Sequence, residues 1–290
     1  MLILLIGAGL LALICVAMMR HQHVGVSEEG AVRLVRLIGA LIGLIAAWAT
    51  ATSPWLSLGR GLMLAPVVWG VCVLLGVLFG ERCVRRPDAG TILTAELRPR
   101  RVRDYLPRSL TIVVLASAAT GVVLLAVATS TASPDDLGRA GRWLTIVCGG
   151  GVSASTGPYP GSFYSIPLAI SLCLVSLLAG SAAVRAVRRP HGQKGERADT
   201  DVLRHRSATA VVAGLGVAIA APLAGVSTTM ARAQLGISCA SSAHHMIGWT
   251  ATSLALANAF LSIYCMALLT VRTGTRGLYI ATGSATTPTS

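Results

Sequence analysis

Residues 110–130 read LTIVVLASAATGVVLLAVATS, a stretch without Asp, Glu, Lys, Arg or His. An α-helix of about 20 apolar residues crosses the ~30 Å hydrocarbon core of a bilayer, so this stretch predicts a transmembrane helix. Six further stretches have the same character, and none has a charged residue or a histidine in its middle. The seven predicted spans are residues 1–19, 37–58, 62–79, 110–130, 165–184, 208–228 and 246–271. The sequence therefore predicts an all-α protein, a polytopic transmembrane helical bundle with seven spans.

The composition agrees with a membrane protein. Of the 290 residues, 54% are hydrophobic and 12% are charged, whereas soluble domains contain about 25% charged residues. The formal net charge of +13 would indicate nucleic-acid binding if position were ignored, but the basic residues lie between the spans. We therefore expect no nucleic-acid partner. Lys194 is the only lysine, an arginine bias that is typical of a GC-rich bacterium.

The basic residues are distributed unevenly between the two sides of the predicted bundle. Alternate connections hold 20 basic residues on one side and four on the other, and basic residues favour the cytoplasmic side. This asymmetry predicts a multi-pass protein of the cell membrane with its amino terminus outside and its carboxyl terminus inside. Residues 1–19 then form an anchor ahead of three hairpins, within a single transmembrane domain over residues 1–272. Residues 273–290 are rich in Thr, Ser and Gly and predict a disordered cytoplasmic tail.

Two questions about this arrangement stay open. A start at Met18 or Met19 would remove the first span and leave six. The sequence Val-Arg-Arg-Pro occurs at residues 84–87 and again at 187–190. A parallel duplication of the hairpin explains this recurrence, and so does the preference of arginine for cytoplasmic helix ends.

Arginines in the cytoplasmic loops also predict contacts with lipid. Anionic headgroups at the cytoplasmic face attract basic segments that lie next to the membrane. The lipid bilayer is therefore an expected partner at this face. The residues that we expect to contact anionic lipids are Arg85, Arg86, Arg100, Arg101, Arg188 and Arg189.

The longest outer connection, residues 131–164, predicts a helix on the membrane surface. It begins Ser133-Pro134-Asp135-Asp136, and Ser, Pro and acidic residues are typical of a helix start. A stripe of apolar side chains follows at helical spacing, formed by Leu137, Ala140, Leu144 and Val147. We therefore expect an amphipathic helix here, and we favour this interpretation over a catalytic pair of carboxylates.

The cysteines predict one disulfide bond. Of the seven cysteines, only Cys148 and Cys239 fall in predicted outer segments, and an oxidising compartment favours their pairing. Two free thiols, or a metal site formed by Cys148 with His244 and His245, are the alternatives, but neighbouring histidines on a helix point in different directions. We therefore expect a disulfide, no metal site and no cofactor.

Neutral polar residues near the middle of the bilayer define a possible binding site. Pro222 interrupts the sixth span, and the seventh span carries Asn258, Thr252 and Ser262. A broken helix beside a polar one can form a site at the membrane midplane. Ordinary hydrogen bonding between helices explains Asn258 equally well.

The sequence favours a function without catalysis. No Gly-x-Ser-x-Gly, His-Glu-x-x-His or kinase motif occurs. With its Arg-rich loops and spans rich in Ala, Gly and Val, the chain resembles uncharacterised multi-pass membrane proteins of actinobacteria, a resemblance that implies no activity. We expect a partner subunit of another membrane protein or a small carrier of a neutral or lipid-like solute. A sensor that signals through its Arg-rich cytoplasmic loops is the alternative, and an enzyme is a third interpretation.

Overall fold

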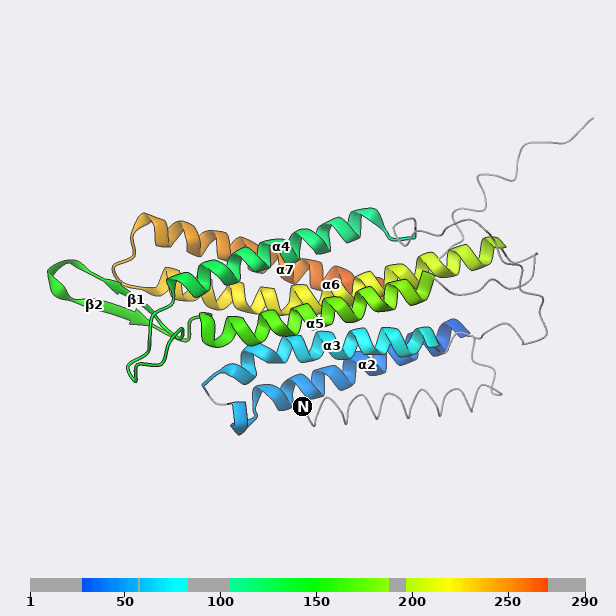
Figure 1. Cartoon of the computed structure of the whole chain (residues 1–290), viewed down its shortest axis with the longest axis horizontal. Coiled ribbons are helices and arrows are strands. Elements are labelled where there is room, and N and C mark those ends of the chain that lie inside the picture. Colours follow the sequence, from blue (N-terminus) through cyan, green and yellow to red (C-terminus); the bar gives the residue numbers. More distant parts are fainter. Residues whose placement is uncertain (1–27, 57, 83–104, 188–196, 271–290) are drawn as a thin grey trace, which may run out of the picture.

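The computed structural model describes residues 28–56, 58–82, 105–187 and 197–270, which form a bundle of long helices with a small β-hairpin at one end (Figure 1). The helices are α2 (Glu28–Ala51), α3 (Arg60–Arg82), α4 (Arg108–Thr131), α5 (Ser162–Val187), α6 (Arg197–Gly236) and α7 (Ser242–Thr270). The other elements are the short 3-10 turns η1 (Pro54–Leu56) and η3 (Gly149–Gly151) and the strands β1 (Leu144–Val147) and β2 (Ser153–Thr156).

Each of these six α-helices contains a segment that is long and apolar enough to cross a membrane. The all-α class and the membrane-type helices are therefore confirmed for the described part of the chain. The first predicted span, the carboxyl-terminal tail and the six arginines expected to contact anionic lipid lie outside the described residues. The total of seven spans and the orientation remain predictions.

Two helices have bounds that differ clearly from the predicted spans. α6 has 40 residues, whereas the predicted span covered 208–228. Its last turns remain buried, as Met230 and Gln234 show, because other segments cover them. α2 instead ends at Ala51, earlier than predicted, because the chain turns into η1 at Pro54.

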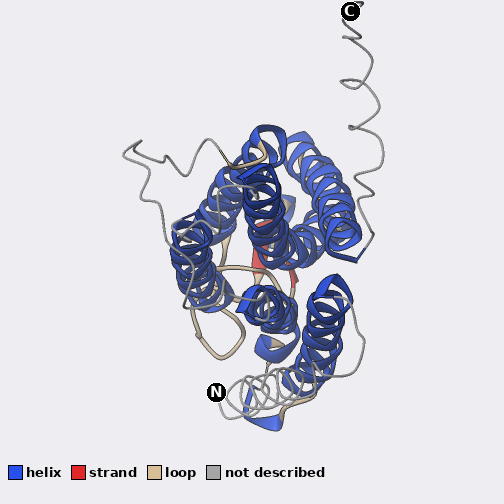
Figure 2. Cartoon of the chain, turned by 90° about the vertical axis from the view of Figure 1, so that its right-hand side faces the viewer, coloured by secondary structure: helices blue, strands red, loops and turns tan. Residues whose placement is uncertain are grey.

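Helix α6 lies at the centre of the bundle. In its apolar span 72% of the residues are buried, compared with 22% in the span of α7. α6 packs against α3, α4, α5 and α7, and Figure 2 shows the helices side by side in a view along the bundle. Small residues permit this close approach: a Cβ atom added to Gly70 of α3 would lie 2.4 Å from the Cα atom of Ala218 in α6.

The three consecutive helix pairs pack differently. α2 packs along α3, and α6 packs along α7, whereas α4 and α5 make few contacts with each other and pack mainly on α6. We call the end of the bundle that carries β1 and β2 the hairpin end. The turns between α2 and α3 and between α6 and α7 lie at this same end (Figure 1).

A β-hairpin replaces the amphipathic helix predicted within residues 131–164, so that prediction was wrong. β1 and β2 pair antiparallel, with Leu144 opposite Thr156 and Val147 opposite Ser153. The β-branched run Thr145-Ile146-Val147 favours a strand. The η3 turn closes the hairpin, where glycines adopt the positive φ values that other residues avoid.

The segment before β1 also contains turns that prevent a helix. Gly138 and Gly141 have φ values of 74° and 70°, a left-handed conformation that ends helices. Asp135, predicted to lie in a first helical turn, instead accepts hydrogen bonds from the backbone N–H groups of Leu137 and Arg139 at 3.1 and 2.8 Å. Its carboxylate thus stabilises a local turn.

The close contact between α3 and α6 generates a stability prediction. Gly70→Val forces a side chain against the backbone of Ala218, so we expect the variant to lose about 1–3 kcal/mol of stability, as overpacked cores do. The matched control is Gly180→Val on α5, where an added Cβ atom meets no atom within 4 Å. Thermal unfolding of both variants in detergent checks the prediction, and equal melting temperatures would contradict it.

Candidate functional site

The predicted midplane residue Asn258 is part of a helix interface. It is buried, and its Oδ1 atom accepts a hydrogen bond of 2.6 Å from the Ser117 hydroxyl of α4. Its Nδ2 atom donates to the carbonyl of Leu254 in the same helix. Asn258 therefore joins α4 to α7, as ordinary packing between membrane helices requires.

The other predicted midplane residues have contacts or burial within the helices that carry them. Thr252 donates to the carbonyl of Gly248 within its own helix, and Ser262 is buried on α7. By helical spacing, Pro222 shares the face of α6 that carries Ala218, which packs against α3. Neither of the two cavities described below is lined by these residues.

The structure places the sulfur atoms of Cys148 and Cys239 at disulfide-bonding distance, as predicted. The two Cα atoms are 5.9 Å apart, and the residues are separated by 91 positions in sequence. Cys148 follows β1 directly, and Cys239 lies in the turn between α6 and α7. The disulfide therefore ties the hairpin to the last pair of helices.

A chain of hydrogen bonds connects four segments below the hairpin. His244 of α7 contacts Gln234 of α6, with 2.7 Å between Nδ1 and Oε1. The Gln234 Nε2 atom donates to the hydroxyl of Tyr159 at 3.2 Å. Thr131 of α4 donates to the carbonyl of Val127, so the Tyr159 hydroxyl donates to Thr131 over 2.7 Å. Since the Gln234 oxygen only accepts, Nδ1 of His244 carries the proton of that bond.

This hydrogen-bond chain is well shielded from solvent. Tyr159 and Gln234 are both fully buried, and burial raises the pKa of the Tyr159 phenol. The sequence suggested His244 only as a metal ligand. It missed Gln234, because that residue lies beyond the predicted end of the sixth span.

The chain of hydrogen bonds generates a second stability prediction. Tyr159→Phe leaves the buried Gln234 amide without its acceptor, so we expect a loss of about 1–3 kcal/mol. The same change at Tyr264, which is exposed on α7, is the matched control and should leave stability unchanged. Thermal unfolding in detergent measures both. If Tyr159→Phe and Tyr264→Phe unfold at the same temperature, these hydrogen bonds contribute nothing to stability.

A second polar cluster surrounds Asp135, which is buried together with Arg142. The Asp135 carboxylate accepts hydrogen bonds from Nε of Arg139 at 2.8 Å and from Nη1 of Arg142 at 2.6 Å. Burial alone would raise the pKa of Asp135, but hydrogen bonds from Arg139 and its positive charge lower that pKa below its usual range. The carboxylate therefore stays ionised and is shared between two arginines.

Aromatic and basic side chains meet beside this cluster. The guanidinium carbon of Arg60 lies 3.6 Å from the centre of the Phe163 ring, and that of Arg142 lies 4.8 Å from the same centre. Such distances allow favourable interactions between a cation and the ring. Phe163 therefore links the start of α3 to the loop that precedes β1.

The turn that positions Arg60 has an uncommon backbone. Leu58 and Gly59 have φ values of 67° and 81°, and a non-glycine residue in this left-handed region costs roughly 1–2 kcal/mol. The hydroxyl of Tyr164 donates a hydrogen bond to the carbonyl of Leu58. α5 thereby holds this turn in place and fixes where α3 begins.

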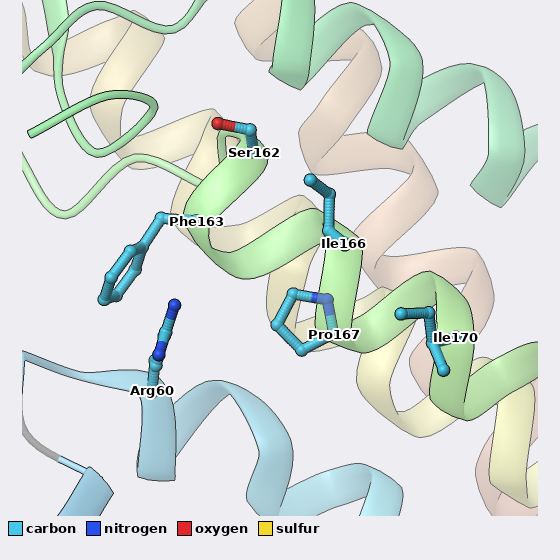
Figure 3. Close-up of a pocket in the computed structure, with 6 residues that line it drawn as sticks. All are labelled: Arg60, Ser162, Phe163, Ile166, Pro167 and Ile170. Carbon is cyan, nitrogen blue, oxygen red and sulfur yellow. The ribbon is translucent and has the colours of Figure 1, made fainter.

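An open cleft lies between α3 and α5 at this point (Figure 3). We call it the Arg60 cleft; its volume is about 380 Å³, and its lining residues are Arg60, Ser162, Phe163, Ile166, Pro167 and Ile170. Figure 3 shows Arg60 extending from α3 toward Phe163, which places the charge at one end of the cleft. Ile166 and Ile170 form the other end, and their side chains are 57% and 56% exposed.

A second cavity of about 300 Å³ lies among residues that neighbour this cleft. It is lined by Leu58, Gly59, Arg142, Trp143, Pro158 and Tyr164. The hairpin end thus combines basic groups, aromatic rings and open space. From the sequence, Arg60 is only one of the four outer basic residues. Its role in a cleft could not be predicted, because the sequence does not show that α3 and α5 are neighbours.

The fold and this site together define an all-helical bundle of the membrane type with a basic cleft at its hairpin end. The chain matches no protein family, no curated protein and no solved structure.

Proposed function

We propose that the chain is a non-enzymatic membrane protein that binds a lipid-like amphiphile in the Arg60 cleft. The observation that carries this proposal is the polarity of the cleft: a guanidinium at one end and exposed isoleucines at the other. Small-molecule sites are typically apolar with a few polar groups that fix orientation. An amphiphile matches both ends of the cleft, and it can enter sideways from the bilayer.

A carrier with a midplane site for a neutral solute has less support. α6 packs closely against α3, and Asn258 is bonded to Ser117. Both are packing contacts between helices, and neither is directed at a solute. We therefore propose that a lipid-like ligand binds at the hairpin end and not at the midplane.

The distribution of arginine also predicts that the hairpin end faces outside, which would place the cleft in the outer leaflet. We expect a cysteine at Ser155, an exposed residue of β2, to react with an impermeant thiol reagent in intact cells. The background keeps Cys148 and Cys239 and lacks the other native cysteines. A cysteine at Ser284 is the control and should react only after lysis. If the cysteine at Ser284 reacts in intact cells and the cysteine at Ser155 reacts only after lysis, the orientation is the opposite of the predicted one.

Obstruction of the cleft tests the binding function. Ile170→Trp fills the apolar end of the cleft, so we expect the purified protein to retain fewer lipid molecules. The matched control is Ile263→Trp, which places the same side chain on the exposed face of α7. Native mass spectrometry after extraction with mild detergent counts the retained lipids. Equal lipid retention by the two variants would exclude the cleft as the binding site.

A role as partner subunit is the second candidate, and the hairpin favours it. The hairpin projects beyond the helices (Figure 1), and the disulfide holds its turn against the α6–α7 connection. Val147 and Val152 are 79% and 64% exposed beside that turn. These valines offer an apolar contact for another membrane protein. Cross-linking from Val152 to a single specific protein would favour this candidate.

A further inference from the structure

We propose that the ligand of the Arg60 cleft is an anionic phospholipid whose phosphate binds Arg60. This inference rests on the proposed function and adds the chemical class of the headgroup. Its starting point is charge balance at the hairpin end. In the part of the chain that the structure describes, the ion pairs of this end all involve Asp135, which is shared by Arg139 and Arg142.

Arg60 has no carboxylate partner among the described residues. Its contact is the ring of Phe163, and its Nε atom is shielded from solvent without a hydrogen-bond acceptor. A shielded cationic donor without an acceptor is unfavourable. An anion in the cleft would supply both the missing charge and the missing acceptor.

The helices that line the cleft reinforce its positive potential. α3 begins at Arg60, and α5 begins at Ser162; neither helix has an acidic residue in its first turn. The N-terminus of a helix carries a partial positive charge that favours anions and disfavours cations. Arg60 therefore lies where the helix N-terminus disfavours a cation, and it has no carboxylate partner among the described residues to offset this.

The shape of the site matches a phospholipid better than a free anion. A guanidinium is planar and binds two phosphate oxygens at once, and Phe163 restricts its position. From Phe163 to Ile170 the helix rises ~10 Å, and Ile166 and Pro167 line the wall over this length. The phosphate therefore lies at Arg60, and the first carbons of an acyl chain lie along α5. A zwitterionic headgroup would add a cation beside Arg60 and bind less well.

The test compares phosphatidylglycerol with phosphatidylcholine on the full chain in detergent micelles. We expect native mass spectrometry to show a preference for phosphatidylglycerol in the wild type and a decrease of about tenfold in that preference in Arg60→Gln. Arg60→Lys should retain part of the preference, because the charge remains and the planar fork is lost. Arg232→Gln is the control; it removes an exposed arginine of α6 and should leave the preference unchanged.

A second variant keeps Arg60 and tests the charge alone. Ser162→Asp places a carboxylate at the start of α5, where acidic residues stabilise helices. The Ser162 side chain lies close to Gly141, so the fold of this variant is checked separately. This carboxylate would neutralise Arg60 and should lower the preference for phosphatidylglycerol. The melting temperature without added lipid, measured for each variant, separates loss of binding from loss of fold.

The outcomes distinguish the two levels of the proposal. An unchanged preference in both Arg60→Gln and Ser162→Asp overturns the anionic headgroup, while Ile170→Trp still reports on the cleft itself. If Ile170→Trp retains as much lipid as its control, the proposed function fails as well. Thermal stabilisation by glycerol 3-phosphate equal to that by phosphatidylglycerol would identify a free phosphate ester as the ligand and overturn the lipid assignment.

Discussion

Close contact between small residues along α6 is the constraint on which the rest of the structure depends. Within lipid, helices gain little from apolar burial alone, so van der Waals contact must hold them together. Gly70 against Ala218 and Gly216 against Cys265 let α3 and α7 approach α6 from different sides. A central helix with small residues at these contact points can be surrounded in this way.

The hairpin end is held by a different set of interactions. Here the segments are held by the hydrogen bonds that run from His244 to Thr131, by the ion pairs of Asp135, and by the disulfide. Buried polar networks specify one arrangement when every member has a partner. Arg60 is the basic group beside this network that receives only a ring contact. Arg60 differs from Arg139 and Arg142 in having no carboxylate partner among the described residues, and this difference makes the cleft a candidate site for an anion.

The sequence was sufficient for features that depend on local composition. Apolar stretches located the helices, and compartment reasoning paired Cys148 with Cys239. It was insufficient where contacts between distant segments decide the outcome. The spacing of Leu137 and Leu144 imitated a helical face, but Gly138 and Gly141 adopt positive φ values and the chain pairs as strands instead. The cleft could not be predicted from the sequence for the same reason, because it exists only where α3 and α5 meet.

The two helices beside the cleft share a property that matters for its shape. α3 contains Pro66 and α5 contains Pro167, six residues after Arg60 and five residues after Ser162. Proline has no N–H group, so each helix lacks one backbone hydrogen bond at this depth. The walls of the cleft can therefore bend at these two positions. If the proposed lipid binds there, a cleft between two such helices could vary in width, which would suit acyl chains of differing length and saturation.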